Sequence, residues 1–502
     1  MLRNVGSNWA LILVTIAASY LLTPFIIHAL GEEGYGTWTL ITTLTGHISL
    51  LALGVPMACV RYLSQHVAAG DTRRMNQTIG SCVGLYGVVG VVAAVLGALL
   101  LLFFQQYSIP DGWKAESLLA FWVMVVTVSA SFMGFLPEGI LFAHHDFVRR
   151  NVIRMAGVLL RTGLTIGLLA LDASLVALAS IQLTCLAFDF FVSWLIISRR
   201  YPEVRIGLAG FNLGVVREIF SFSVWVLLLT AGARLSFESD ALVIGAFMGV
   251  GAIPFYVVAN SLIVYLIDFM TSIAAVVSPM TTKLNTEGRI DEVRAMFLKW
   301  SKVALSLTIM AGLFLCVLGP RFIAWWIDPS YEQPAGGVLQ ILMVSSFIFL
   351  PVRGVAVPIL MGLGKPRMPA LAFIAAGLLN VGLSMALIGP LGLAGVALGT
   401  AIPNVLFSLV VLTVVCRELD VSVAHWTRYV VPRATLGALP VLALLLWFRL
   451  GLQVQSLTGL LVAGIVMVLL FGLVWIGFVY RGDPYVDVRA QKLLVMRAWG
   501  RA

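Results

Sequence analysis

Ionised side chains inside long apolar runs are the residues of this sequence that could do chemistry. They are Arg161, Asp189, Arg234, Glu238, Asp240, Asp268 and Arg353. A charge near the centre of a membrane helix costs about 2.5–3.5 kcal/mol on insertion scales, so such a group normally faces a bundle interior or a watery cavity. The sequence therefore predicts a polar interior within a membrane protein.

The three arginines are candidates for binding an anionic group. Arg353 lies about twelve residues, or about 18 Å of helix, from Lys365 and has no acidic residue in its own apolar run. A guanidinium group can bind phosphate oxygens through two parallel hydrogen bonds. We therefore predict Arg353, Arg234 and Arg161 as substrate-binding residues, with Arg353 and Arg234 contacting a diphosphate.

Three acidic residues are candidates for binding a coupling proton or sodium ion. Asp268 lies near the middle of its apolar run, and Asp240 lies about 12 Å from the outer end of its own. Glu238 lies two residues before Asp240. Loss of water around a carboxylate favours its protonated form, which lets such a group exchange a proton. Asp268 and Asp240 could instead be helix-packing partners.

Local charge pairing is the structural alternative for two of the arginines. Arg234 and Glu238 are four residues apart on one helix face and could neutralise each other. Arg161 and Asp189 fall on consecutive predicted helices and could form a second structural pair.

Sequence signatures of enzymes are absent. The nearest approach to a P-loop, Gly362-Leu363-Gly364-Lys365, lacks the first glycine and the final Ser or Thr. HExxH and G-x-S-x-G do not occur, and the five cysteines are scattered singly without metal-type spacing. We expect neither an enzyme nor a metal or cofactor site, apart from the coupling ion.

The composition places these residues in an integral membrane protein. Of the 502 residues, 60% are hydrophobic and 11% are charged, against about 25% charged in soluble chains. The formal net charge of +9 could suggest nucleic acid, but the basic residues lie in short loops between apolar runs. Membrane orientation explains that placement, so we predict no nucleic-acid partner.

The apolar runs predict an all-α membrane protein with fourteen transmembrane helices. Their expected ranges are about 7–30, 35–63, 78–105, 118–143, 152–171, 174–197, 215–247, 254–281, a ninth ending near 318, then 335–361, 369–388, 391–415, 429–448 and 457–480. We expect an N-lobe at 1–200 with helices one to six, a cytoplasmic linker at 201–214, and a C-lobe at 215–417 with helices seven to twelve. Residues 418–502 hold the last two helices and a basic cytoplasmic tail.

The distribution of basic residues predicts that both termini are cytoplasmic. With that orientation, the 32 Lys and Arg residues all fall on the cytoplasmic side apart from two small groups. Lys114, Arg321 and Arg449 fall outside, and Arg161, Arg234 and Arg353 fall within the membrane. Cytoplasmic loops of membrane proteins carry this excess of positive charge.

The two halves of the chain correspond at an offset of about 218 residues. The outer turn at Gly31 matches the turn at Gly249, and the basic loop AAGDTRRMN matches NTEGRIDEVRAM. Six helices in each copy would give two similarly oriented lobes, related about an axis normal to the membrane.

The chain resembles the polysaccharide-transport and lipid-linked oligosaccharide (O-antigen-type) flippase family of the MOP exporter superfamily, which is related to MATE exporters. The residues that carry the resemblance are Leu30-Gly31-Glu32-Glu33-Gly34-Tyr35-Gly36-Thr37-Trp38, Leu53-Gly54-Val55 with Arg61-Tyr62, Asp240-Ala241-Leu242-Val243-Ile244-Gly245 before Phe255-Tyr256, and Ser278-Pro279 leading to Lys283-Leu284. The resemblance implies a multi-pass protein of the bacterial inner membrane that moves a lipid-linked glycan. Membrane lipids and glycan polymerase or ligase machinery would be its partners.

The leading hypothesis is a secondary-active flippase that moves a polyprenyl-diphosphate-linked oligosaccharide, or a related polysaccharide precursor, across the membrane by alternating access. A MATE-like, ion-coupled exporter of organic cations is the alternative within transport. A non-transporting membrane scaffold, whose buried charges would tolerate neutral replacement, is the alternative outside it. We favour an anionic substrate because the positive charge of Arg353 would not help a pocket to bind a cation.

Overall fold

The computed structural model describes residues 2–52 and 54–486 of the chain, with only the backbone described at 2–5, 9, 220–227, 229, 272 and 275. Its regular structure in these residues is entirely helical. The basic tail predicted after the last helix falls mainly in 487–502, outside the described residues.

The helices follow one another with short connections. The first set is α1 (Leu2–Ile48), η1 (Ser49–Ala52), α2 (Val55–Ala68), α3 (Thr72–Phe104), α4 (Asp111–Ala143), α5 (Phe147–Leu169), α6 (Leu175–Arg200), η2 (Leu208–Gly210), α7 (Leu213–Phe237), α8 (Asp240–Phe247) and η3 (Val250–Ala252). The second set is α9 (Ile253–Thr286), α10 (Ile290–Val317), α11 (Gly319–Trp326), η4 (Pro329–Tyr331), α12 (Pro334–Pro351), η5 (Val352–Ala356), α13 (Val357–Gly362), α14 (Arg367–Glu418), α15 (Val423–Leu446), η6 (Trp447–Gly451), α16 (Leu457–Val474) and η7 (Trp475–Val479).

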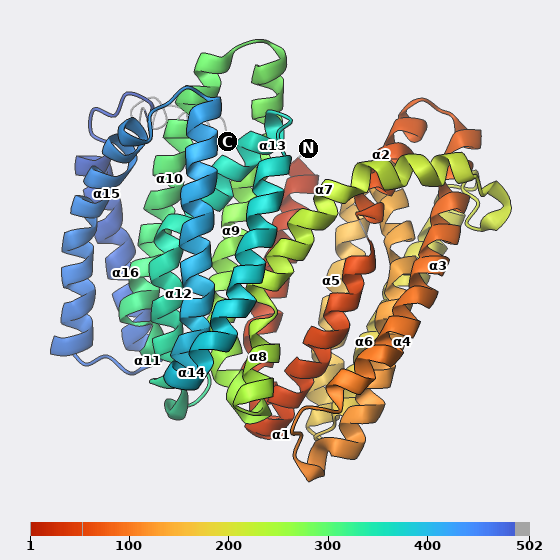
Figure 1. Cartoon of the computed structure of the whole chain (residues 1–502), viewed down its shortest axis with the longest axis horizontal. Coiled ribbons are helices and arrows are strands. Elements are labelled where there is room, and N and C mark those ends of the chain that lie inside the picture. Colours follow the sequence, from red (N-terminus) through yellow and green to blue (C-terminus); the bar gives the residue numbers. More distant parts are fainter. Residues whose placement is uncertain (1, 53, 487–502) are drawn as a thin grey trace. The chain divides into compact units, whose positions relative to one another are not determined.

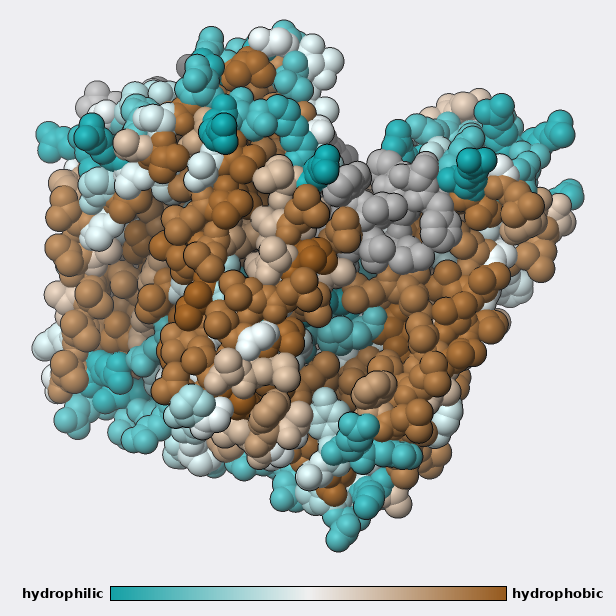
Figure 2. Space-filling view, viewed as in Figure 1, coloured by the Kyte–Doolittle hydropathy of each residue, from teal (hydrophilic) through white to brown (hydrophobic). Residues whose placement is uncertain are grey.

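Eleven stretches of helix among the described residues are long and apolar enough to cross a membrane. Figure 2 shows hydrophobic side chains along the middle of the helices and hydrophilic ones near their two ends. Because no water is available inside a bilayer, each spanning segment must satisfy its own backbone hydrogen bonds, which a helix does. The chain is a multi-pass helical membrane protein.

Two of these stretches are long helices bent at a glycine. α1 has 47 residues and bends at Gly31 (φ 69°), and α14 has 52 residues and bends at Gly392 (φ 57°). Glycine adopts a positive φ at little cost because it has no β-carbon. The structure therefore joins the predicted helices one and two into α1, and the predicted helices eleven and twelve into α14.

Two predicted helices are broken instead of continuous. The helix expected at 35–63 is interrupted by η1 and by Gly54, which has a φ of 73° and precedes α2. The helix expected at 215–247 ends at Phe237 and resumes at Asp240 as α8. No proline marks the second break, so the apolar pattern alone predicted one continuous helix there.

The chain divides into two compact units. Unit 1 comprises Met1–Arg234 and Glu238–Pro254, and unit 2 comprises Leu235–Phe237 and Phe255–Ala502. Within unit 1, α4 packs on α3 and α6, and α1 packs on α5 (Figure 1). Within unit 2, α12 packs on α10 and α14, while α15 packs on α10 and α16.

The backbone repeats at the spacing that the sequence predicts. Gly31 and Gly249, 218 residues apart, have φ values of 69° and 87°, and Gly70 and Gly288 have φ values of 66° and 71°. The start of α3 at Thr72 matches the start of α10 at Ile290, and the end of α6 at Arg200 matches the end of α14 at Glu418. The two copies thus turn at equivalent residues.

Candidate functional site

Arg353 lies where a long helix changes its hydrogen-bonding pattern. It belongs to η5, a π-helical turn in which the Val357 N–H donates to the carbonyl of Val352. Pro351 and Pro358 stand on either side. Proline has no N–H to donate, so each one interrupts the regular backbone ladder. Single π turns inside α-helices occur frequently at functional sites.

Aromatic rings surround the Arg353 guanidinium. Its central carbon lies 5.7 Å from the ring centres of Phe237 and Phe349 and 5.1 Å from that of Phe373. Nη1 is buried and has no hydrogen-bond partner among the described residues. Ring faces attract a guanidinium but cannot accept all of its five N–H groups. The residue therefore retains hydrogen-bonding capacity for an oxygen ligand.

Asp268 supplies negative charge near Arg353 without pairing with it. The two side chains interact electrostatically, and no ion pair joins them in the part of the chain that the structure describes. Asp268 is exposed and lies close to the middle of α9. The structure thus brings one predicted substrate-binding residue and one predicted ion-coupling residue together within unit 2.

Arg234 is paired in unit 1. Its Nη1 donates to Glu238 Oε2 at 3.0 Å and to the carbonyl oxygen of Gly46 at 2.7 Å. Gly46 lies in the last turn of α1, where helix carbonyls lack intrahelical partners. The pairing expected from the four-residue spacing of Arg234 and Glu238 is therefore present, and Arg234 also caps α1.

Glu238 and Asp240 lie at the break between α7 and α8. Glu238 is the C-cap residue of α7, and Asp240 is the first residue of α8. A carboxylate is stabilised at a helix N-terminus by the free N–H groups there. Asp240 is buried, with 1% of its surface exposed.

Arg161 and Asp189 are separate, although the sequence allowed them to pair. Both are described residues of unit 1, and no ion pair joins them. Arg161 is exposed on α5. Asp189, on α6, lines a cavity and has a buried Oδ1 without a hydrogen-bond partner among the described residues.

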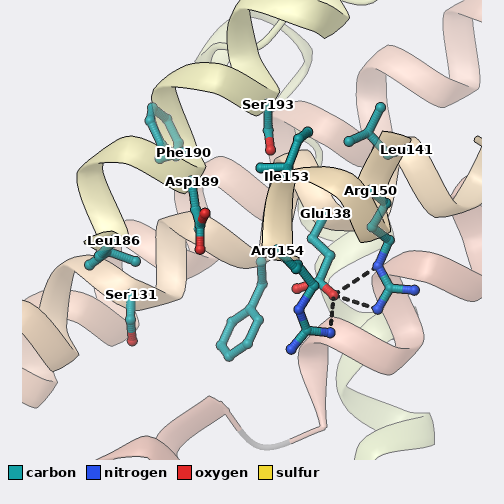
Figure 3. Close-up of a pocket in the computed structure, with 12 residues that line it drawn as sticks. Ser131, Glu138, Leu141, Arg150, Ile153, Arg154, Leu186, Asp189, Phe190 and Ser193 are labelled. Carbon is teal, nitrogen blue, oxygen red and sulfur yellow. Dashed lines mark hydrogen bonds and ion pairs between the residues drawn. The ribbon is translucent and has the colours of Figure 1, made fainter. Parts of the chain in front are cut away.

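This cavity also contains charged groups that the sequence analysis missed. Glu138 of α4 binds Arg150 of α5 through Nε at 2.9 Å and Nη2 at 2.5 Å, and it binds Arg154 Nη1 at 3.3 Å (Figure 3). Glu138 lies within a predicted membrane helix, directly after Pro137. Its position among apolar residues was the signal that could have identified it.

A second missed cluster is the buried ion pair of Lys302 and Asp483 in unit 2. Their side chains are 1% and 0% exposed, and the Lys302 ammonium lies 4.6 Å from the Tyr429 ring centre. Tyr429 donates a hydrogen bond to Asp483 Oδ1 at 2.7 Å. The sequence analysis counted Lys302 with the basic residues of the cytoplasmic side and did not predict its burial against Asp483.

The glycines of the Leu30–Trp38 motif permit close packing within unit 1. A β-carbon on Gly36 would lie 1.9 Å from the Val250 carbonyl oxygen, and one on Gly34 would lie 2.7 Å from the Trp113 ring. Only glycine permits such an approach. The close contact between α1 and η3 therefore explains the glycines of this motif.

Together, the helical architecture, the repeat and the buried charges define a multi-pass membrane protein with polar groups in its interior. The family described as "Polysaccharide biosynthesis protein" matches residues 1–285. The chain belongs to this family.

Two curated relatives match along most of their length. An uncharacterized membrane protein, EpsK, of Bacillus subtilis (strain 168) is 23% identical over 468 residues, which is 87% of this chain and 86% of the relative. A putative O-antigen transporter of Shigella flexneri is 20% identical over 397 residues, which is 77% of this chain and 90% of the relative.

Solved structures show the same fold. An inward-facing multidrug resistance MATE family transporter of the MOP superfamily aligns with a TM-score of 0.69 at 17% identity, covering 81% of this chain and 98% of its own. The lipid II flippase MurJ, in an inward closed conformation, aligns with a TM-score of 0.67 at 13% identity, covering 96% of this chain and 99% of its own. The chain therefore has a MATE-like fold.

Proposed function

We propose that this protein is a secondary-active flippase that moves a polyprenyl-diphosphate-linked oligosaccharide, or a related polysaccharide precursor, across the cytoplasmic membrane by alternating access. Membership of the polysaccharide biosynthesis family supports a glycan substrate. The O-antigen transporter and the lipid II flippase are similar proteins whose names denote such transport.

The observation that carries the proposal is the unsatisfied guanidinium of Arg353. A buried N–H without a partner costs about 1–3 kcal/mol, which a bound phosphate oxygen would recover. Nη1 of Arg353 is such a group, and the rings around it cannot accept its proton as an oxygen can. A diphosphate supplies oxygens in the geometry that the guanidinium fork binds. Arg353 would hold the charged head of the glycolipid. Arg234 and Arg161, which belong to unit 1, stay candidate substrate-binding residues.

The finer features of the carrier belong to the same proposal. With 47 and 52 residues and a bend at a glycine, α1 and α14 are each long enough for two passes. Together with one more pass from α7 and α8, this supports fourteen passes. The basic loops support cytoplasmic termini, and the family resemblance supports the inner membrane. We propose lobes at 1–200 and 215–417, with a linker at 201–214. Asp268, Asp240 and Glu238 are the candidate acids for binding a coupling proton or sodium ion. Glycan polymerase or ligase machinery is the further partner that we propose.

Substitution of Arg353 tests this function. We expect Arg353→Ala to abolish surface-glycan production while the protein still inserts at normal levels, and Arg353→Lys to restore only part of it because lysine lacks the planar fork. The control is Arg367→Ala, which removes an exposed arginine of the same unit. Binding of a fluorescent polyprenyl diphosphate to the purified variants measures the same contact directly.

Two results would contradict the proposal. Normal glycan output and unchanged polyprenyl diphosphate binding in Arg353→Ala would remove the reason for an anionic substrate. Efflux of an organic cation that survives Arg353→Ala but fails in Asp268→Asn would instead indicate a MATE-like exporter.

A further inference from the structure

The cavity of unit 1 lies at the position in the repeat that Arg353 occupies in unit 2. The residues 218 positions after Ser131, Phe135 and Asp189 are Phe349, Arg353 and Phe407. In unit 2, Phe349 and Phe407 pack against each other with ring centres 5.8 Å apart. In unit 1, Ser131 and Asp189 stand in their places and line a cavity of about 190 Å³. Replacing two large rings by short polar side chains explains why the space is open.

Asp189 lines this cavity with a carboxylate oxygen that lacks a hydrogen-bond partner. Its Oδ1 is buried without a hydrogen-bond partner among the described residues. The α-carbon of Gly157 packs against it so closely that a β-carbon there would lie 2.5 Å from Oδ1. That side of the carboxylate is closed, and Figure 3 shows Asp189 without an interaction line while Glu138 is joined to both arginines. A buried carboxylate lacking donors is stabilised by taking up a proton.

The charges around Asp189 come from both helices packed on α6. Glu138 comes from α4, and Arg150 and Arg154 come from α5. Cys185 of α6 is the other titratable neighbour of Asp189. Arg150 makes the two short contacts to Glu138, and Arg154 makes the single long one at 3.3 Å. Arg154 is therefore the guanidinium that can exchange between Glu138 and an ionised Asp189, to which it is electrostatically attracted.

We propose that Asp189 is a proton-binding site of unit 1, with Arg154 as the positioning residue that stabilises its ionised form. On binding, an O–H bond of a hydronium ion breaks and an O–H bond forms on the Asp189 carboxylate, leaving water and a neutral acid. Arg154 is then held by Glu138, as in the structure. On release, Arg154 turns toward the negative Asp189. That this cycle drives transport rests on the function proposed above, but the binding itself does not.

A proton fits the cavity better than a metal cation. A sodium ion needs several oxygen ligands, whereas the Glu138 carboxylate, the other acid that lines the cavity, is already bound by Arg150 and Arg154. Two guanidinium groups at the cavity would also repel a metal cation. A proton requires only one carboxylate oxygen.

The cavity has a route to water. Asp189 lies eleven residues before the end of α6 at Arg200, which is about 16 Å of helix. Glu138 and Arg154 have 35% and 52% of their side-chain surface exposed, so the charged cluster reaches the surface of the protein. The cavity has space for several water molecules, because each one needs about 10–15 Å³ of such a cavity volume.

Infrared difference spectroscopy of the full chain in lipid nanodiscs tests the proposal without any glycolipid. We expect the wild type to gain, as the pH falls from about 9 to 5, a C=O stretch from Asp189 in addition to those of other buried carboxyl groups such as Asp240. Asp189→Asn should lose this band entirely. Asp172→Asn, which changes an exposed carboxylate on the α5–α6 connection, is the matched control and should retain it.

A second variant tests the positioning role. We expect Arg154→Gln to keep the band and to move its pH midpoint upward, because the ionised form loses its stabilising charge. Arg154→Lys should restore much of the original midpoint.

Several outcomes would overturn the proposal. These are a spectrum that Asp189→Asn leaves unchanged, an Asp189-dependent band that does not change with pH, and an Asp189-dependent band that sodium ions remove at constant pH. The last would make the site a metal-cation site. None of these readings depends on Arg353 or on glycan output, so failure here and failure of the flippase function are distinguishable.

Discussion

At the scale of single residues, the buried arginines serve two different purposes. Arg353 retains an unpartnered Nη1, whereas Arg234 donates to both Glu238 and the carbonyl of Gly46. Arg234 therefore stabilises the end of α1 whether or not it also contacts substrate. The two contacts contribute differently to stability. The partly exposed ion pair with Glu238 contributes little, whereas the carbonyl of Gly46 at the helix end needs a hydrogen-bond donor.

The two contacts of Arg234 can be separated by substitution. We expect Glu238→Gln to change the free energy of unfolding by less than about 1 kcal/mol, since the pair is partly exposed. Arg234→Ala should cost more, on the order of 1–3 kcal/mol, because Gly46 loses its donor. Thermal unfolding in detergent measures both, and equal losses in the two variants would assign the stabilisation to the ion pair.

The sequence predicted which charged residues lie within the helices, but it predicted only some of the residues that they contact. The four-residue spacing of Arg234 and Glu238 predicted their contact because a helix fixes that geometry. The spacing could not reveal that Asp189 faces Glu138 and Gly157, since this depends on how α4, α5 and α6 rotate against one another. The aromatic surroundings of Arg353 likewise come from three separate helices.

At the scale of elements, glycine spacing was the most reliable signal. Turns at Gly31 and Gly249 were expected from the matched halves, and both have positive φ. The helix break after Phe237 was not predictable, because no proline or glycine marks it and Glu238 and Asp240 read only as charges in an apolar run. The π turn at Arg353 lies between Pro351 and Pro358.

Close packing between α1 and η3 predicts the effect of a single methyl group. We expect Gly36→Ala to destabilise unit 1 by about 1–3 kcal/mol, since the added carbon would meet the Val250 carbonyl oxygen at 1.9 Å. Gly87→Ala is the control, because it adds a methyl group where no atom lies within 4 Å. Thermal unfolding should show a lower midpoint for Gly36→Ala only, and similar midpoints would contradict the packing.

The ion pair of Lys302 and Asp483 joins α10 to the segment after η7. Removing one partner of such a buried pair leaves an uncompensated charge and costs about 3–5 kcal/mol. We expect this loss in Lys302→Met alone and much less in Lys302→Met with Asp483→Leu, where no charge remains. Chemical unfolding of the purified proteins measures the difference, and an equal loss in both variants would contradict it.

The same pair predicts a dependence of stability on pH. Burial raises the pKa of Asp483, but hydrogen bonds from Lys302, Tyr429 and the Tyr485 N–H lower it by more, so the net shift is downward. A lowered pKa stabilises the folded state above the unfolded value of about 3.9, and this stabilisation is lost as the pH falls through the folded value. The stability difference between wild type and Asp483→Asn should therefore shrink as the medium is acidified below about pH 4. A difference that is constant with pH would rule this out.

At the scale of the whole molecule, the two copies of the repeat have the same backbone turns but different side chains in their interiors. Equivalent turns at Gly70 and Gly288 show the shared plan. At equivalent depths, unit 1 holds a cavity with Asp189, and unit 2 holds Arg353 among aromatic rings. The two copies thus share one backbone plan, while an aspartate beside an arginine–glutamate cluster lines one interior and an arginine among aromatic rings lies in the other.

The repeat also predicts which loops share a side of the membrane. An even number of passes in each copy would place Ala69 and Glu287, which are 218 residues apart, on one side, and Leu171 and Gly389 on the other. All four positions are exposed in the structure. We expect single cysteines at the first two to react with a membrane-impermeant maleimide only after the cells are opened, and cysteines at the other two to react in intact cells. The parent protein is the blank because its native cysteines are buried or half-buried. Opposite labelling of the first two positions would mean an odd number of passes between them, and the two copies could not then be parallel.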